Sequence, residues 1–132
     1  MHDEQTIQEV ANATGLSEHT LRYYERIGLI TAIRRAENGH RRYSAGDLGW
    51  IDFLKRLRAT GMPIEQMKEY AALQRAGEHT LTARLNLLKA HRRAVLEQIA
   101  ELEENLSVIE YKIDWYSHEQ EKQAHVTQVG TV

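Results

Sequence analysis

The sequence contains no cysteine, which excludes several kinds of site at once. Without thiols the chain has no disulfide framework, no thiolate zinc site, no iron–sulfur cluster and no cysteine redox switch. Proline is also scarce, with one residue beside eight glycines, and this composition argues against a disordered chain. The 132 residues, 42% of them hydrophobic, suffice for one or two small units with a modest core.

Long apolar runs are missing as well. No stretch approaches the roughly 20 apolar residues that cross a bilayer, and the N-terminal residues 1–5 are polar and acidic, unlike a secretory signal. We therefore expect a cytoplasmic protein with no membrane contact. No nucleophile–base pair, carboxylate pair or phosphate-binding loop is evident in the sequence. We accordingly expect neither enzyme activity nor a cofactor.

Charge is unevenly distributed along the chain. The net charge is −2, yet residues 1–63 hold 9 Lys+Arg against 8 Asp+Glu, whereas residues 64–132 hold 8 against 11. Residues 17–43 are the extreme, with six arginines and three acids. Guanidinium groups and phenol hydroxyls both bind phosphate oxygens. The N-terminal half is therefore the part that we predict to contact a polyanion.

The start of this region has the pattern of a helix-turn-helix. A short helix is predicted over residues 6–13, and Gly15 ends it. Ser17 is a good N-cap for a second helix, which runs to about Ile27 and stops at Gly28. Two helices joined by a tight, glycine-containing turn define the motif.

A β-hairpin and two further helices should follow. Asn38-Gly39 is a strong hairpin signal because both residues tolerate positive φ. We place a hairpin from about Ala32 to Tyr43 and call it the wing. A third helix should start at Ser44 or at Gly46-Asp47, and a fourth should run from Pro63 to about Gln74.

From Leu81 onward the apolar residues recur at alternating spacings of four and three. The seam that they form, with one break at Arg92, comprises Leu81, Leu85, Leu88, Val95, Ile99, Leu102, Leu106, Ile109, Ile113 and Tyr116. A heptad repeat of this length is typical of a coiled coil. At ~1.5 Å per residue the helix is roughly 50 Å long, so a small domain cannot bury its seam. We therefore expect a homodimer, and the heptads alone leave parallel and antiparallel pairing open.

These patterns divide the chain into four parts. Residues 1–75 are predicted to form a winged helix-turn-helix domain, residues 76–80 a hinge, residues 81–119 a coiled-coil dimerisation helix and residues 120–132 a flexible tail. The residues expected to hold the dimer together are Leu85, Leu88, Val95, Ile99, Leu102, Leu106, Ile109 and Ile113. Arg92 either pairs with Glu101 or Glu104 of the partner helix or is solvated in a splayed region.

Taken together, the chain resembles the MerR family of transcriptional regulators over roughly residues 5–117. The motifs that carry the resemblance are Thr20-Leu21-Arg22-Tyr23-Tyr24-Glu25, Ile27-Gly28-Leu29, Asn38-Gly39-His40-Arg41-Arg42-Tyr43-Ser44, Asp47-Leu48 and Leu57-Arg58-Ala59-Thr60-Gly61-Met62. Each motif alone is weak, and their combined spacing is specific. Trp50, Pro63-Ile64, Tyr111-Lys112-Ile113 and Tyr116 add similarity to the small aldehyde- and stress-responsive members.

The family resemblance also implies a dimer arrangement, a kind of DNA site and a set of partners. Members of the family are mainly α-helical winged helix-turn-helix dimers joined by an antiparallel coiled coil. They bind a pseudo-palindrome inside a promoter spacer that is too long for polymerase, and they act by distorting the DNA, so that deformation energy carries the regulation. The implied partners are double-stranded promoter DNA, a second copy of the chain, RNA polymerase at the promoter and an unknown small-molecule effector. Activation and repression both remain open.

Several departures from the family pattern limit the sensing mechanism. Metal-sensing and redox members use cysteines, and many aldehyde-responsive relatives carry one cysteine where this chain has Arg56. A thiol-based mechanism is therefore excluded here. His40 stands in the wing where the family usually has tyrosine. An alternative function is a protein-interaction adaptor on the same scaffold, of the chaperone-modulator type; the retained arginines at 22, 35 and 41 argue against it.

The family match assigns DNA-contact roles to particular residues of the second helix. Arg22 is expected to reach a guanine edge or a phosphate. Tyr23 and Tyr24 are adjacent and cannot share one helix face; the match favours Tyr24 as the phosphate contact and Tyr23 as mainly core. His19 and Thr20 lie early on the helix, where residues that contact base edges belong.

Further contacts are expected from the wing and from the third helix. Arg41 resembles the arginine that enters the minor groove or holds the backbone there, while Arg42 is equally open to a salt bridge or a DNA contact. Arg35 and Arg58 resemble phosphate clamps, and His40 completes the wing contacts.

Two other features have a plain structural interpretation. The seven histidines are scattered and no pair is three or four apart, so we expect no metal site. Five aromatic residues could line an effector pocket, although core and interface packing is the simpler interpretation. They are Trp50, Phe53, Tyr70, Tyr111 and Tyr116.

Overall fold

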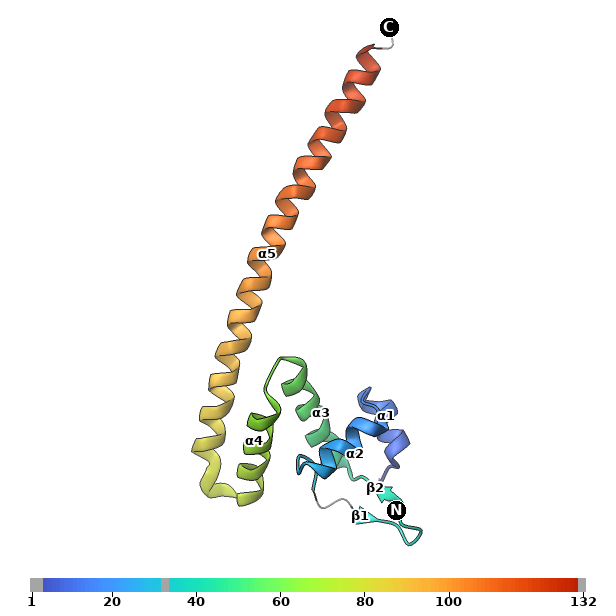
Figure 1. The fold of residues 1–132 in the computed structure, drawn as a ribbon, viewed down its shortest axis with the longest axis vertical. Coiled ribbons are helices and arrows are strands. Elements are labelled where there is room, and N and C mark those ends of the chain that lie inside the picture. Colours follow the sequence, from blue (N-terminus) through green and yellow to red (C-terminus); the bar gives the residue numbers. More distant parts are fainter. Residues whose placement is uncertain (1–3, 32–33, 131–132) are drawn as a thin grey trace. The chain divides into compact units, whose positions relative to one another are not determined.

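The structure is a computed structural model that describes residues 4–31 and 34–130. Figure 1 shows the elements in chain order: α1 (Ile7–Thr14), α2 (Glu18–Arg26), β1 (Arg34–Arg35), β2 (Arg41–Arg42), α3 (Ala45–Ala59), α4 (Ile64–Ala76), the 3₁₀ turn η1 (Glu78–Thr80) and α5 (Leu81–Gly130). The chain separates into two compact units, Met1–His91 and Arg92–Val132. The mainly α-helical fold that the sequence predicts, with an N-terminal helix-turn-helix and a long C-terminal helix, is confirmed.

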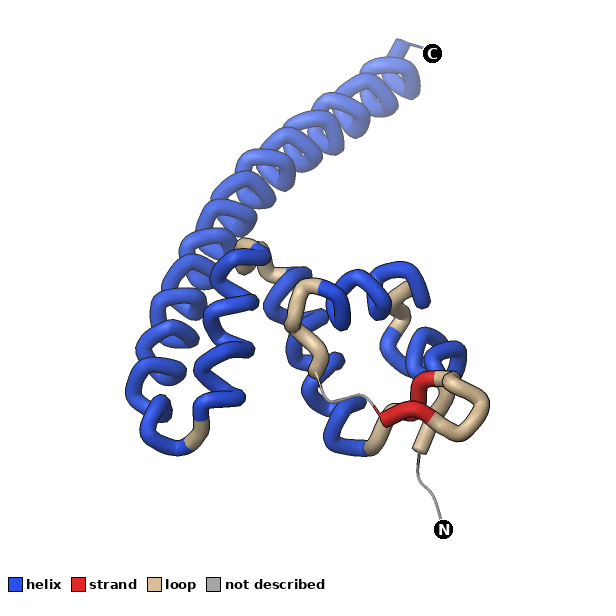
Figure 2. Tube along the Cα trace, turned by 60° about the horizontal axis from the view of Figure 1, so that its bottom comes forward, coloured by secondary structure: helices blue, strands red, loops and turns tan. Residues whose placement is uncertain are grey.

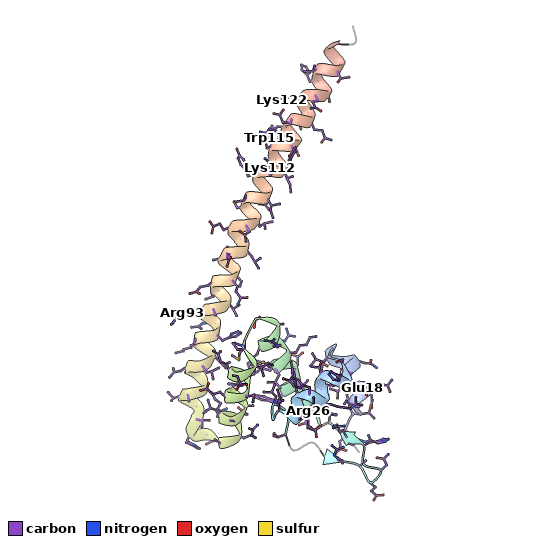
Figure 3. All side chains as sticks on the ribbon, viewed as in Figure 1. Glu18, Arg26, Arg93, Lys112, Trp115 and Lys122 are labelled. Carbon is purple, nitrogen blue, oxygen red and sulfur yellow. The ribbon has the colours of Figure 1, made fainter. Side chains whose placement is uncertain are left out.

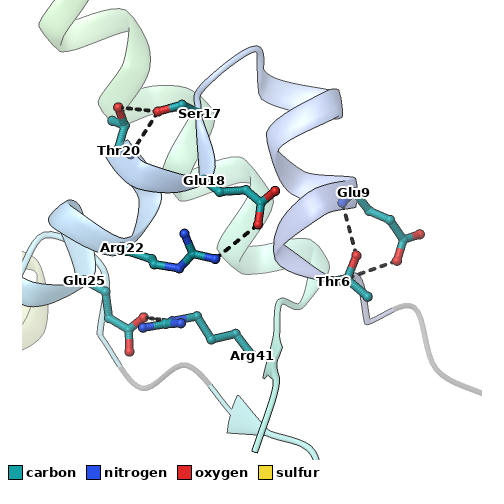
Figure 4. Close-up of polar contacts among 8 residues, drawn as sticks. All are labelled: Thr6, Glu9, Ser17, Glu18, Thr20, Arg22, Glu25 and Arg41. Carbon is teal, nitrogen blue, oxygen red and sulfur yellow. Dashed lines mark hydrogen bonds and ion pairs between the residues drawn. The ribbon is translucent and has the colours of Figure 1, made fainter.

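Local signals fix the helix-turn-helix. The Thr6 side chain accepts a hydrogen bond from the Glu9 amide (3.1 Å) and the Glu9 carboxylate accepts one from the Thr6 amide (3.0 Å), which closes a capping box at the start of α1. These bonds, the one to the Thr6 backbone first, lower the pKa of Glu9. Ser17 caps α2 in the same way through the Thr20 amide at 3.0 Å (Figure 4). Gly15, at φ 78°, supplies the left-handed residue that ends α1.

The wing is short in the structure. Arg34 pairs with Arg42 and Arg35 with Arg41 in an antiparallel register, around a turn in which Gly39 has φ 82°. An isolated antiparallel bridge joins Tyr43, the residue after β2, to Gln5 in the segment before α1. Figure 2 shows the two strands and their connecting loop. The first two positions of the predicted hairpin, 32 and 33, lie outside the described residues.

The core of the first unit is built from all of its helices. Its largest fully buried side chains are Tyr43, Leu21, Leu29, Ile30, Ile51, Leu54, Met62, Met67 and Val10. Burying a side chain of this size stabilises the fold by roughly 1.5–3 kcal/mol. Leu87 and Leu88, at the start of α5, pack against the same cluster. Leu88, predicted as a dimerisation residue, is therefore partly used within its own chain.

The turn between α4 and α5 is more ordered than the predicted hinge. Gly77 has φ 107°, and residues 78–80 form the 3₁₀ turn. Thr80 is buried, and its hydroxyl lies 2.7 Å from the carbonyl oxygens of both Leu73 and Gly77. Arg84 donates to the Thr80 hydroxyl at 3.0 Å and to the Gln74 amide oxygen at 2.6 Å. Residues 76–80 thus form a hydrogen-bonded corner, and their role as a hinge stays a prediction.

The second unit consists of the rest of α5. The helix runs to Gly130, so residues 120–130 are helical and the prediction of a frayed tail from residue 120 is wrong for them. The polar composition suggested an end, but no glycine or proline interrupts the sequence between Leu81 and Val129. Figure 3 shows side chains on all sides of this helix. The seam residues Ile99, Leu102, Leu106, Ile109 and Ile113 are all 45% or more exposed. No helix in the described part of the chain is long and apolar enough to cross a membrane.

Candidate nucleic-acid interface

A groove of about 370 Å³ lies where α2 meets the wing and the start of α1. Its lining includes Arg22, Glu18, His40, Arg41 and Arg42. Three guanidinium groups against one carboxylate give the groove a positive balance, and each guanidinium presents donors that match phosphate or guanine acceptors. The structure thus brings the predicted contact residue Arg22 together with Arg41 and Arg42, which lie 19 and 20 residues later in the sequence, whereas Arg35 and Arg58 do not line the groove.

Arg22 is exposed and held along the helix. Its Nη2 lies 3.2 Å from the carboxylate of Glu18, one turn earlier, and both side chains stay largely in solvent. An exposed pair with this spacing is worth about 0.3–0.5 kcal/mol. A nucleic-acid acceptor could therefore take Arg22 from Glu18 at small cost.

The wing arginines make a stronger set of contacts with α2. The Nε of Arg41 donates to the carboxylate of Glu25, whose other oxygen lies 3.5 Å from Nη2 of Arg35. Figure 4 shows the Glu25–Arg41 contact beside the Arg22–Glu18 pair. Arg35 also donates to the Gly39 carbonyl at 3.0 Å, across the wing turn. Arg42 donates to the carbonyl of Arg41 at 3.2 Å.

The two adjacent tyrosines have exposures opposite to the prediction. Tyr24 is buried, with 5% of its surface exposed, whereas Tyr23 is 37% exposed. The expectation that Tyr23 is mainly core is therefore wrong, whereas the phosphate contact expected of the Tyr24 hydroxyl stays a prediction. The reason is helical spacing: Tyr24 follows the fully buried Leu21 by three residues and shares its face, while Tyr23 lies on the neighbouring face. Burial raises the pKa of Tyr24, and the nearby Arg58 partly offsets the shift.

The remaining predicted contact residues are spread around this region. The exposed His19 and the half-buried Thr20 lie in the first turn of α2, and the Thr20 hydroxyl accepts a hydrogen bond from Ser17 at 2.9 Å. His40 is exposed at the wing turn, where its amide donates to the Asn38 side chain at 3.1 Å. Arg58, exposed in the last turn of α3, donates to the Met62 carbonyl at 3.2 Å and does not line the groove.

Sequence reasoning missed two participants in this region. Glu25 was part of the recognised motif but received no role, although it is the acid that contacts the wing arginines. Arg26 stacks on Tyr23, with its guanidinium 5.5 Å from the ring centroid, and so adds a cation beside the exposed tyrosine. The available signal for Glu25 was its position as one of three acids in the arginine-rich stretch.

Tyr43 lies beneath these charges without a partner for its hydroxyl. The residue is fully buried, and its oxygen has no hydrogen-bond partner among the described residues. Burial raises the pKa of Tyr43 above its ordinary value of 10.0, and the negative charge of Glu25 raises it further. The positive charges of Arg41 and Arg22 partly offset this rise in pKa. The ring fills the core, whereas the hydroxyl carries a desolvation cost.

We expect Tyr43→Phe to stabilise the protein. Removing a buried hydroxyl without a partner should raise the free energy of unfolding by about 1 kcal/mol, measured by urea titration at pH 7. The raised pKa means that the folded state holds the Tyr43 proton more tightly than the unfolded state. The native protein should therefore lose stability as the pH rises above about 10, and Tyr43→Phe, which has no proton to lose there, should lose less. Tyr23→Phe, at an exposed site, is the matched control and should change little. A destabilised Tyr43→Phe would show that the hydroxyl is satisfied.

The aromatic residues considered for an effector pocket belong to separate units. In the first unit, the rings of Trp50 and Tyr70 stack at 5.7 Å, and Phe53 meets Tyr70 at 5.8 Å. The indole of Trp50 donates to the Leu29 carbonyl at 2.7 Å. These contacts are those of core packing, although a pocket of about 200 Å³ borders Trp50. Tyr111 and Tyr116 are exposed on the second unit. No group of three or more His, Cys, Asp or Glu in the described ranges is arranged to hold a metal.

A helix-turn-helix with a wing and an arginine-lined groove is the architecture of a DNA-binding protein. The chain matches the family model for a MerR HTH family regulatory protein over residues 5–74 and the model for a MerR DNA-binding region over residues 48–110. The protein belongs to the MerR family of transcriptional regulators.

Three known proteins illustrate the relationship. The HTH-type transcriptional regulator AdhR of Bacillus subtilis is 43% identical over 91 residues, which are 69% of this chain and 65% of AdhR. The crystal structure of a MerR family regulator from Listeria monocytogenes is 42% identical, covers 96% of both chains and has a TM-score of 0.90. HiNmlR, a MerR family regulator lacking the sensor domain and bound to promoter DNA in its crystal structure, is 36% identical with a TM-score of 0.80, over 86% of this chain and 90% of that one.

Proposed function

We propose that this regulator binds a pseudo-palindromic site within a promoter spacer as a homodimer and acts on RNA polymerase by distorting the DNA. The observation that carries the proposal is the groove between α2 and the wing, because it joins three arginines from two elements. A helix and a hairpin that present cations together suit one major groove and its flanking backbone. HiNmlR, which is bound to promoter DNA, supports this assignment by similarity.

The homodimer is supported by the apolar seam of α5. Leu102, Leu106 and Ile109 are 66%, 52% and 55% exposed on the isolated chain. Exposed apolar residues at heptad spacing are the signature of a helix that pairs with another helix. An antiparallel pair is the family arrangement. With the seam residues from 85 to 113 paired end to end, its centre falls at Ile99, where the two copies would meet.

DNA distortion is the mode of action that the family resemblance implies. A dimer carries two such positive grooves, one for each half-site, and the family resemblance implies that both engage a duplex that is bent or untwisted between the half-sites. Smooth bending of a site of 20–30 base pairs costs about 1–6 kcal/mol, which phosphate contacts can offset. A small-molecule effector would act by changing this balance, and the pocket beside Trp50 is one place for it to bind.

The proposal is tested by selecting fragmented genomic DNA with the purified full-length protein and sequencing what is retained. The expected result is enrichment of an inverted repeat centred in a promoter spacer, with a fluorescence change between dyes at the two ends of the site when protein binds. Enrichment without a change in end-to-end distance would keep DNA binding and remove distortion. No enrichment even at low salt, where phosphate contacts are strongest, would overturn the proposal and favour the protein-interaction adaptor.

A further inference from the structure

Glu25 joins the recognition helix to two of the wing arginines, Arg35 and Arg41. One carboxylate oxygen accepts from Nε of Arg41 and the other lies 3.5 Å from Nη2 of Arg35. Arg35 and Arg41 are register partners, directly opposite each other on the two strands. Like charges in that position repel one another. The negative charge of the Glu25 carboxylate therefore offsets the repulsion between Arg35 and Arg41, which face each other on the two short strands of the wing.

This contact differs in burial from the helix-surface ion pairs of the same unit. The side chains of Glu25 and Arg41 are 23% and 22% exposed. Those of Arg22 and Glu18 are 48% and 41% exposed, and those of Arg56 and Asp52 are 73% and 47% exposed. The latter two pairs also join residues four apart on one helix, whereas Glu25 and Arg41 are 16 apart. Water screens the Glu25–Arg41 contact less, so breaking it is harder than breaking a surface pair. The Arg35 side chain is 48% exposed, so its contact with Glu25 is screened like a surface pair.

A DNA phosphate is chemically a competitor of Glu25. Both present anionic oxygens to a guanidinium, and an arginine whose donors already face Glu25 can give fewer to the backbone. On a random sequence, where few other contacts form, phosphates gain little by displacing the carboxylate. On the correct site, the base contacts of α2 hold the wing against the DNA and make the exchange, or a shared contact, favourable.

We propose that Glu25 is a specificity-determining residue, which holds the wing arginines and suppresses their binding to non-cognate phosphates. This inference rests on the proposed DNA-binding function. It assigns to an acidic residue that contacts a groove arginine the role of lowering affinity for random DNA. It predicts that removing the negative charge, while keeping the shape, raises general DNA affinity and lowers discrimination.

The test compares Glu25→Gln with the native protein on two duplexes of equal length, the selected promoter site and a scrambled sequence, over a series of salt concentrations. The amide keeps the size and an acceptor, so the wing should remain folded; a thermal melt checks this. We expect the affinity for the scrambled duplex to rise roughly tenfold and that for the promoter site to rise less. The salt slope on the scrambled duplex should steepen by about 0.9 for each arginine released to a phosphate.

Two controls separate charge from position. Asp52→Asn removes the carboxylate of the Arg56–Asp52 ion pair on α3 and should leave the ratio of the two DNA affinities unchanged. Glu25→Asp keeps the charge and should keep scrambled-duplex binding close to that of the native protein, which makes the test independent of how well Glu25→Gln folds.

The outcomes distinguish this inference from the function on which it rests. If the native protein does not prefer the promoter site over the scrambled duplex, the DNA-binding proposal fails and this inference falls with it. If the native protein discriminates and Glu25→Gln discriminates equally well, the role of Glu25 alone is overturned. Equal weakening of both duplexes would also overturn it, because Glu25 would then only support the fold of the wing.

Discussion

Replacing Ile99 by aspartate should convert the protein from dimer to monomer and abolish tight DNA binding. Ile99 is 45% exposed on α5 and occupies the middle of the seam. In a symmetric antiparallel coil, and equally in a parallel one, this residue meets its own copy, so the substitution places two carboxylates against each other in an apolar interface. A site with two half-sites then loses the second attachment, which is worth about 10²–10⁴ in affinity.

Light scattering at micromolar concentration measures the first effect, and anisotropy of a labelled promoter duplex measures the second. Val108→Asp is the matched control, because Val108 is a β-branched residue on the same helix, 66% exposed and outside the seam. It should leave both mass and affinity unchanged. A monomeric native protein, or a dimeric Ile99→Asp, would contradict the assignment of the seam.

The orientation of the two helices can be determined with single-cysteine variants, because the chain has no native cysteine. A mixture of Leu85→Cys and Ile113→Cys proteins should form mixed disulfides if the coil is antiparallel, since the Cα atoms must approach within about 7 Å to bridge. Each variant bridged only to itself would indicate a parallel pair.

Much of the first unit could be predicted because its boundaries are encoded locally. Ser17 and Ser44 cap the helices that follow them, and Gly39 forms the turn of the wing. Each of these signals depends on a few neighbouring residues and on backbone stereochemistry. The end of α5 shows the opposite case: polarity alone predicts a tail over residues 120–130, yet no glycine or proline stops the helix before Gly130.

The site shows where such local reasoning stops. The spacing of the two tyrosines from Leu21 already indicates that Tyr24 is buried and Tyr23 exposed, against the expectation that Tyr23 is mainly core. The contact between Glu25 and Arg41 has no comparable signal, because it depends on how the hairpin folds back over α2. Long-range ion pairs join residues whose distance in sequence carries no periodicity, so only the folded chain brings them together.

Replacing Arg22 by alanine should weaken binding to the promoter site by roughly tenfold to a hundredfold, the equivalent of about 1–3 kcal/mol for one good base contact. Arg22 lines the groove, is exposed, and is held only by a surface pair with Glu18. Because the Arg22 side chain is exposed and is not one of the buried core residues, its loss should affect DNA binding and leave the thermal melt close to that of the native protein. Arg56→Ala, which removes an arginine from a similar four-residue pair on α3, is the control and should bind like the native protein.

The way in which affinity is lost identifies what Arg22 contacts. If it donates to a guanine edge, Arg22→Ala should weaken the promoter site far more than a scrambled duplex, and the preference at one base-pair position should relax. If it holds a phosphate, both duplexes should weaken about equally and the salt slope should fall by about 0.9. Unchanged affinity for both duplexes would contradict the assignment of α2 as the recognition helix, because the most exposed cation of the groove would then have no acceptor on the DNA.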